Sequence, residues 1–476
     1  MISAIFLVVL LISTYKLTIS PPPWYDEGII IQTAKHMYGT GELLIRVAPD
    51  TLIKAGVIAS TGFPVVLPES IIFHFFGSGL FQARMLMVLY IFGLVVAVYF
   101  FARELYGKKI ALYSLLLVGS FAQVYGNGKN VLGEVPGLFF LVLFLFFLTR
   151  LERRDFKGWH LYVLAGLTAG LAVATKPIFL ILLGAGGIAY FIHIRKIKFE
   201  FRSLFLGVLS LLVPLGYWAW NQFGGYANVQ AVLNDYANPY ALSDVSAMML
   251  TNAKLFFTST TPIYFALLLV ALLVSFGIRR FREGAPLKIA ETIILIFSIL
   301  DVVVFLRTAG WYRYLFIGFV PLLILFPYAL ENIIYWVGSL LRTPSFSGKL
   351  TPTILGLLIL FQFYQIGFSS FVSDYYTSTR SASLEQYFSM QDPAKSVFLY
   401  DIPEAVIFLK SENYYQYLHV SDSLIVGQDE VEKIYVGIPD SIVLGSRTWD
   451  AWKLNLGFDR YSEKERFERY VVLERL

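Results

Sequence analysis

Long apolar stretches constrain this chain most, because a helix needs about 20 apolar residues to cross the hydrocarbon core of a bilayer. We predict about eleven spans, of which the fourth to sixth are short. They lie near residues 2–19, 82–102, 110–126, 134–149, 160–175, 177–193, 203–222, 261–278, 288–306, 313–336 and 351–371. Since backbone groups in lipid must be hydrogen-bonded within the segment, the predicted fold class is mainly α, a polytopic transmembrane helical bundle.

The composition excludes several other classes of protein. Hydrophobic residues make up 57% of the chain and charged residues 15%, whereas soluble domains carry about 25% charged residues. A soluble enzyme, a disordered chain and a nucleic-acid binder are therefore excluded, and no nucleic-acid partner is expected. The chain has no cysteine, which rules out disulfides, thiolate zinc sites and cysteine nucleophiles.

The distribution of basic residues predicts the orientation, since Lys and Arg collect in cytoplasmic loops. Every second loop between the predicted spans is basic, as at 103–109, 150–157, 195–202, 279–288 and 342–349. The remaining loops are poor in bases and include two long ones, about 20–81 and 223–260. We therefore expect a multi-pass protein of the plasma (inner) membrane with a cytoplasmic N-terminus and an extracytoplasmic C-terminal domain. The first span is expected to be an uncleaved anchor.

The composition changes after residue 372, where we place a domain boundary. Residues 1–372 are predicted to form the transmembrane domain and residues 373–476 a small extracytoplasmic α/β domain. From residue 374 onward there are 17 acidic and 11 basic residues. Strand cores are predicted at 396–400, 434–436 and 470–473, a strand or a helix start at 441–444, and a helix around 463–468.

Two groups of polar residues are candidates for catalysis, because polar groups retained near the ends of spans are costly. The first is Trp24-Tyr25-Asp26-Glu27-Gly28, directly after the first span. The second is Lys129-Asn130 followed by Glu134 at the start of a very apolar helix. Adjacent carboxylates can keep one group ionised as a base or metal ligand. The structural alternative for both groups is helix capping.

Basic residues on the predicted outer side form a third group. They are Arg84, Lys176, Arg307 and Arg313, the last beside Tyr312. An anionic ligand such as a lipid phosphate would explain them, since Arg binds phosphate with two parallel hydrogen bonds. The alternative is snorkelling to outer headgroups, which we favour for Arg84 or Arg307 taken singly, while Lys176 and Arg313 favour phosphate.

One acid, Asp301, lies inside a predicted span. We expect it to pair with an arginine such as Arg307, and a proton or ion site is the alternative. Gly166 and Gly170 have a spacing typical of close helix packing, which we expect to be within the chain.

Taken in order, these motifs resemble those of the polytopic GT-C glycosyltransferases, in particular the protein O-mannosyltransferase and aminoarabinose-transferase group, which uses polyprenyl-phosphate sugars. The likeness covers most of residues 1–335. It rests on the following segments: Trp24–Gly28, Phe63-Pro64, Phe75–Gly77 ahead of Arg84, Ala102–Gly107, Gly133–Pro136, Ala174–Pro177, and Tyr312–Tyr314 followed by Pro321.

The resemblance implies an inverting transfer of a sugar from a polyprenyl- or dolichyl-phosphate donor to an acceptor hydroxyl on the outer face. It implies Asp26 as the base, with Glu27 and Glu134 orienting substrate or holding a divalent metal ion. Lys176 and Arg313, with Arg84 and Arg307, would bind the donor phosphate. The substrate-pocket candidates are Trp24, Tyr25, Lys129, Asn130 and Tyr312. No cofactor is certain, and the metal requirement is unknown.

The sequence leaves other points open. The acceptor can be a glycolipid, a polysaccharide or a protein. Membrane lipid is an expected partner of the protein with any of these acceptors. The alternative function is a multi-span transporter or lipid flippase. Transporters commonly contain inverted repeats with matched broken helices, and no such halves are visible in this sequence.

Overall fold

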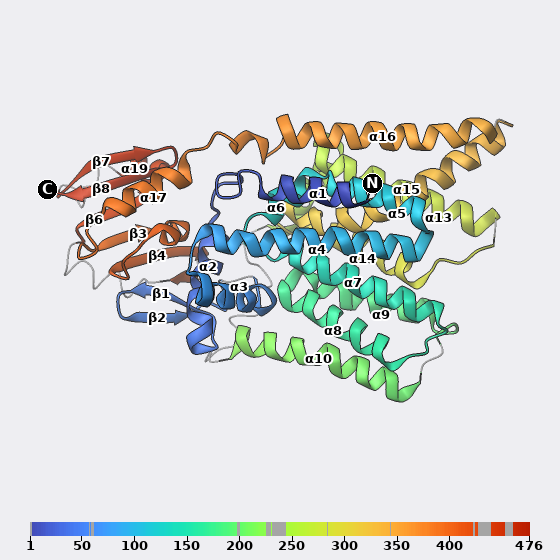
Figure 1. Ribbon diagram of the computed structural model, residues 1–476, viewed down its shortest axis with the longest axis horizontal. Coiled ribbons are helices and arrows are strands. Elements are labelled where there is room, and N and C mark those ends of the chain that lie inside the picture. The colour runs from blue at the N-terminus through green and yellow to red at the C-terminus, as the bar shows by residue number, and fades with distance from the viewer. Residues whose placement is uncertain are drawn as a thin grey trace.

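The computed structural model describes most of the chain and supports a membrane-spanning helical protein. The described residues are 2–56, 58, 61–197, 200–224, 230, 244–282, 284–342, 344–421, 424–426, 439–452 and 460–476. A helical bundle occupies one half of the molecule, and a β-sheet lies beyond one end of it (Figure 1). Between them lie elements formed by the first long loop.

Every predicted span coincides with a helix or a broken helix. These elements are α1 (Ile2–Thr14), α4 (Leu80–Tyr106), α5 (Lys108–Gly119) with α6 (Ala122–Gly128), α7 (Glu134–Arg153), α8 (Trp159–Thr175), η1 (Pro177–Leu180) with α9 (Ile181–His193), α10 (Phe201–Phe223), α13 (Thr260–Arg282), α14 (Ile289–Leu306), α15 (Arg313–Leu340) and α16 (Pro344–Phe368). Within the described ranges, seven helices are long and apolar enough to cross a membrane, or eight if the α5–α6 pair, bent by 55°, is one span.

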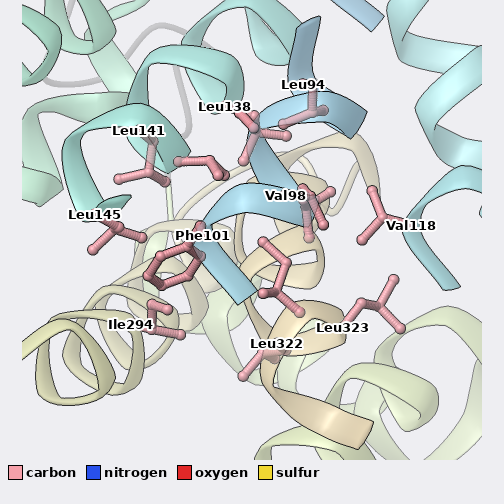
Figure 2. Packing of buried hydrophobic residues seen from close by; sticks show 14 of the residues in the cluster. Leu94, Val98, Phe101, Val118, Leu138, Leu141, Leu145, Ile294, Leu322 and Leu323 are labelled. Atoms are coloured by element: carbon pink, nitrogen blue, oxygen red, sulfur yellow. The ribbon is translucent and has the colours of Figure 1, made fainter. Parts of the chain in front are cut away.

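The centre of the bundle is closed by apolar side chains from helices that are distant in sequence. Figure 2 shows Leu94 and Phe101 of α4 packed with Leu141 of α7, Ile294 of α14 and Leu322 of α15. All five are almost fully buried. Close packing of this kind holds the helix ends, and therefore the residues at those ends, in fixed positions.

The predicted glycine contact lies between α8 and α10. A Cβ atom on Gly166 would come within 2.0 Å of the Gly207 carbonyl oxygen, and one on Gly170 would come within 2.6 Å of the Leu211 carbonyl oxygen. Glycine at both positions lets the two helix backbones approach, so the prediction of packing within the chain is confirmed.

The first long loop is folded into helices and a hairpin. It contains α2 (Tyr25–Thr40), β1 (Leu44–Ala48), β2 (Thr51–Lys54) and α3 (Phe63–Phe76). β1 and β2 pair antiparallel. The second long loop contains α12 (Val245–Thr258) within its described part.

The C-terminal region contains a six-stranded sheet in the order β5-β4-β3-β6-β8-β7. Its strands are β3 (Val397–Tyr400), β4 (Tyr414–Ser421), β5 (Leu424–Val426), β6 (Ser441–Gly445), β7 (Tyr461–Phe467) and β8 (Tyr470–Arg475), and its helices are η2 (Ser373–Tyr375), α17 (Arg380–Met390), η3 (Pro403–Phe408) and α19 (Ser446–Trp452). β3 is parallel to β4 and β6, whereas β8 is antiparallel to β6 and β7. α17 and η3 pack in one apolar cluster on the sheet and α19 in another.

The predicted strands at 396–400 and 470–473 are confirmed, and 441–444 forms a strand rather than a helix start. The predicted helix at 463–468 is wrong, because this segment is β7. Its charged side chains are exposed along most of its length at the sheet edge, while its backbone pairs with β8. Edge strands commonly carry such charges, which discourage pairing with other chains. The predicted strand at 434–436 lies outside the described residues.

Glycine 28 brings α2 into backbone contact with the C-terminal region. A Cβ atom at Gly28 would lie 2.3 Å from the Glu404 nitrogen and 2.4 Å from the Pro403 carbonyl carbon, both in rigid backbone. Gly39, in the same helix, has no atom within 4 Å of the corresponding position. α2 is thereby held between the bundle and η3.

We predict that Gly28→Ala destabilises the protein by about 1–3 kcal/mol, because the added methyl group forces α2 away from η3. Gly39→Ala is the matched control and should be neutral or slightly stabilising. Thermal unfolding of the purified protein in detergent measures both. Equal melting temperatures for the two variants would contradict the close contact.

Candidate active site

The N-terminus of α2 places its two acids in different environments. Glu27 is fully buried, whereas the Asp26 side chain is 27% exposed. The Glu27 carboxylate accepts hydrogen bonds from the Trp24 and Val131 backbone nitrogens at 3.3 and 3.1 Å. Glu27 therefore caps α2 and joins it to the loop before α7.

Arg84 is the main partner of Glu27, and the pair is inaccessible to solvent. Its Nε and one terminal nitrogen donate to the two carboxylate oxygens of Glu27 at 2.8 and 2.7 Å. The other donors reach the Leu17 and Pro21 carbonyls at 2.7 Å and Asn130 Oδ1 at 2.8 Å. All five guanidinium N–H groups are thus used within the chain.

These contacts revise two of our expectations. Arg84 neither snorkels nor has a donor left for phosphate, so its predicted role in phosphate binding does not fit the structure. Glu27 and Asn130 hold the first loop on the bundle through Arg84. Lys129 has a similar role, since it is fully buried and donates to the Tyr15 carbonyl at 2.7 Å. Burial and the nearby Arg84 lower the pKa of Lys129 to about 7.

A second ion pair joins Asp26 to the start of α15. An Arg313 terminal nitrogen lies 3.0 Å from Asp26 Oδ2, and both side chains are partly exposed. The Arg313 guanidinium lies over the rings of Trp311 and Tyr314, at 4.9 and 5.3 Å from their centroids. These rings fix the direction of the arginine side chain.

A third ion pair joins Glu134, the first residue of α7, to Lys176. Lys176 Nζ lies 2.5 Å from Glu134 Oε1, and both side chains are nearly buried. Lys176 adopts an extended conformation between α8 and η1, which turns its side chain towards α7. Glu134 also lies within electrostatic range of Arg313, so the second and third pairs form one cluster at the same end of the bundle.

Both of these pairs retain unused hydrogen-bonding capacity. Glu134 Oε2 and Arg313 Nε are buried and have no hydrogen-bond partner in the described structure. Buried polar atoms are normally paired, and those left unpaired need an explanation. A bound ligand that donates to Glu134 and accepts from Arg313 would supply the missing contacts.

The remaining predicted residues are placed less centrally. Trp24 is the residue before α2 and packs edge-to-face with Phe371. Tyr312 is exposed at the start of α15. Arg307 is exposed at the end of α14, away from any acid partner in the described residues.

The expected pairing of Asp301 with Arg307 is wrong. Asp301 is fully buried beside Gly318 and makes no ion pair in the described residues. Arg307, the residue that follows α14, is six positions after Asp301, which places the two about 9 Å apart along the helix axis and on different helix faces.

No group of three or more acidic or histidine side chains that could hold a metal ion occurs in the described part of the chain. Asp26, Glu27 and Glu134, the predicted metal ligands, each face a different basic residue. In this arrangement the carboxylate oxygens of these three residues form ion pairs with Arg84, Lys176 and Arg313.

The C-terminal region contributes residues near α2 that sequence reasoning missed. Tyr25 donates to Asp401 Oδ1 at 3.1 Å, and burial together with Asp401 raises the pKa of Tyr25. Tyr25 therefore joins α2 to the sheet rather than lining an open pocket. Nothing in the sequence indicates this contact, because 376 residues separate its partners.

We predict that Glu27→Gln lowers the free energy of unfolding by about 3–5 kcal/mol, because it leaves Arg84 buried without a counter-charge. Asp26→Asn breaks a partly exposed pair and should cost less than about 1 kcal/mol. Thermal unfolding and the yield of folded protein measure the difference. A Glu27→Gln protein as stable as the wild type would contradict the structural role of the pair.

Comparisons with known proteins agree with this fold. Residues 69–220 match the family Dolichyl-phosphate-mannose-protein mannosyltransferase. The crystal structure of ArnT from Cupriavidus metallidurans bound to undecaprenyl phosphate is similar over 99% of this chain and 96% of that chain, with 14% identity and a TM-score of 0.67. The oligosaccharyltransferase of Archaeoglobus fulgidus is similar over 93% and 69%, with 13% identity and a TM-score of 0.53.

Curated protein sequences contain no match to this chain. The similarity to solved structures therefore carries the assignment of the fold, and the family match supports it over the segment from α3 to α10. The predicted resemblance is confirmed, and the chain has the fold of the GT-C glycosyltransferases.

Proposed function

We propose that this protein is an integral-membrane inverting glycosyltransferase. It moves a sugar from a polyprenyl- or dolichyl-phosphate donor to an acceptor hydroxyl. The observation that carries the proposal is the cluster of two acid–base pairs, Asp26–Arg313 and Glu134–Lys176, at one end of the bundle. The ArnT structure contains undecaprenyl phosphate and an archaeal oligosaccharyltransferase structure contains dolichol-phosphate, which supports this donor class.

In this reaction Asp26 takes the proton of the acceptor hydroxyl. The acceptor oxygen forms a bond to the anomeric carbon while the bond from that carbon to the phosphate oxygen breaks, and the electron pair leaves with the lipid phosphate. Attack opposite the leaving group inverts the configuration. Arg313 and Lys176 stabilise the negative charge on the departing phosphate.

Binding of the donor also prepares the base. Asp26 and Glu134 each neutralise one of the two cations in the structure. A phosphate that takes over Arg313 and Lys176 leaves both carboxylates available for the sugar and the acceptor. Glu134, whose Oε2 is unpaired, then accepts a hydrogen bond from a substrate hydroxyl and orients it.

The site faces the extracytoplasmic side if the basic loops lie in the cytoplasm, as the positive-inside rule indicates. The N-terminus is then cytoplasmic, and residues 373–476 form an extracytoplasmic domain beside residues 1–372. The plasma (inner) membrane is the location that we propose. The match of the ArnT structure to almost the entire fold favours a transferase over a transporter.

We predict that Asp26→Asn lowers transfer at least 100-fold, because the amide cannot accept the proton. The experiment supplies labelled polyprenyl-phosphate sugars and crude envelope acceptors to the purified protein in lipid. Binding of the donor and the melting temperature serve as controls and should be retained. Unchanged transfer in this variant would exclude Asp26 as the base.

We further predict that Arg313→Gln or Lys176→Gln weakens the binding of polyprenyl phosphate about 10- to 100-fold, the effect of losing one charged hydrogen bond. Arg307→Gln is the matched control, since Arg307 is an exposed cation at the same end of the bundle, and should leave affinity within twofold. Product inhibition of transfer measures all three variants. Inhibition constants of Arg313→Gln and Lys176→Gln equal to that of the wild type would show that neither residue binds the phosphate.

A further inference from the structure

A separate pocket lies between the first long loop and the C-terminal region. Its volume is about 420 Å³, and its charged or imidazole side chains come from α2, β1, α3 and the segment between η3 and β4. They are Lys35, His36, Arg46, His74, Lys410 and Glu412. No residue of the two acid–base pairs lines it.

The position of the pocket relative to Asp26 follows from the geometry of α2. Lys35 is nine residues after Asp26, which corresponds to about 14 Å along the helix and to the opposite helix face. The pocket therefore lies beyond the proposed catalytic cluster and opens on another side of α2. A ligand long enough to pass along α2 can contact both places.

The charge of the pocket is positive and incompletely compensated. Arg46 pairs with Glu412 at 2.6 Å. Lys35 and Lys410 form no ion pair or side-chain hydrogen bond in the described part of the chain. Lys35 is partly buried, and this burial lowers its pKa although Glu412 opposes the shift. An anion beside Lys35 would compensate the cost of holding this cation out of water.

The wall of the pocket also offers a flat aromatic surface. The rings of Tyr38 and His74 stack with centroids 4.0 Å apart and planes at 17°, and the Tyr38 side chain is exposed. An aromatic face can pack against the C–H face of a sugar ring, while cations and imidazoles beside it contact charged substituents. Together these groups suit a sugar that carries a negative charge.

We propose that this pocket binds an anionic sugar unit of the acceptor, with the charge on a carboxylate or a phosphate group. The unit sits between Lys35 and Lys410 and contacts the Tyr38–His74 stack. It holds the acceptor chain while another part of that chain presents its hydroxyl to Asp26. The assignment rests on the proposed transferase function, and it defines the acceptor as acidic.

Direct binding to the full-length protein in nanodiscs of neutral phosphatidylcholine tests the proposal. The probes are an oligogalacturonate, a hexose phosphate and a neutral malto-oligosaccharide of matched length, measured by calorimetry. We expect saturable binding of one or both anionic probes and at least tenfold weaker binding of the neutral one. The anionic probe that binds better identifies carboxylate or phosphate as the charge. Failure of both anionic probes to bind would overturn the proposal.

Variants locate the binding to this pocket. Lys410→Glu changes an exposed residue and should weaken binding of the anionic probe at least tenfold, and Lys35→Gln should weaken it about tenfold. Lys464→Gln is the matched control, because Lys464 is an exposed lysine on β7 at the opposite edge of the sheet. Binding unaffected by Lys410→Glu and Lys35→Gln would place the ligand elsewhere and overturn the assignment.

Asp26→Asn separates this proposal from the transferase reaction. The variant should bind the anionic probe as the wild type does, since the pocket lies on another face of α2. If the wild-type protein turns over no donor while the probe still binds to the pocket, the proposed reaction fails and the binding site stands. If transfer proceeds to acidic acceptors without any effect of Lys410→Glu on KM or on binding, the pocket assignment fails alone.

Discussion

The buried pair of Glu27 and Arg84 is the contact on which the candidate active site depends. The guanidinium of Arg84, near the start of α4, joins the segment that follows α1, the start of α2 and the loop before α7. Isolated buried charges are costly, and a pair becomes tolerable only when its remaining hydrogen bonds are satisfied. Here every guanidinium N–H is used, so the pair fixes the direction in which α2 leaves the bundle. The adjacent residue, Asp26, is thereby held over the start of α15.

Two neighbouring acids thus receive opposite roles from burial alone. Glu27 points into the protein and forms a buried ion pair with Arg84. Asp26 points towards Arg313 at a partly exposed position. A carboxylate that must exchange partners during a reaction needs access to substrate and a counter-charge that can be displaced. Asp26 meets both conditions. Glu27 meets neither condition. It is buried, and moving Arg84 away from it would also leave the Leu17 and Pro21 carbonyls without their hydrogen-bond donor.

The sequence was sufficient to predict the spans, because a lipid environment demands long apolar helices whatever their partners. It also indicated Asp26, Glu134, Lys176 and Arg313, whose polarity stands out at helix ends and which form two ion pairs in the structure. The sequence could not distinguish the structural role of Arg84 from the roles of these residues, because all of them are charged and lie near the outer ends of predicted spans. Their roles depend on contacts between residues 42 to 287 positions apart. The error at 463–468 has a related cause, because β8 offers that charged segment an edge to pair with, which local pattern does not reveal.

The C-terminal region is physically connected through α2 to Asp26, the proposed base. Tyr25 bonds to Asp401 on one side of this helix, and Gly28 lets the Glu404 backbone approach it on another. Because Asp26 lies between these two contacts, a displacement of the sheet relative to the bundle moves the carboxylate. The pocket around Lys35 spans the same boundary, so a ligand that bridges α2 and Lys410 would favour one relative position of the two parts. In the proposed reaction, acceptor binding at that boundary would stabilise the position of α2 that Asp26 requires to act as the base, and recognition of the acceptor would be coupled to the geometry of proton transfer.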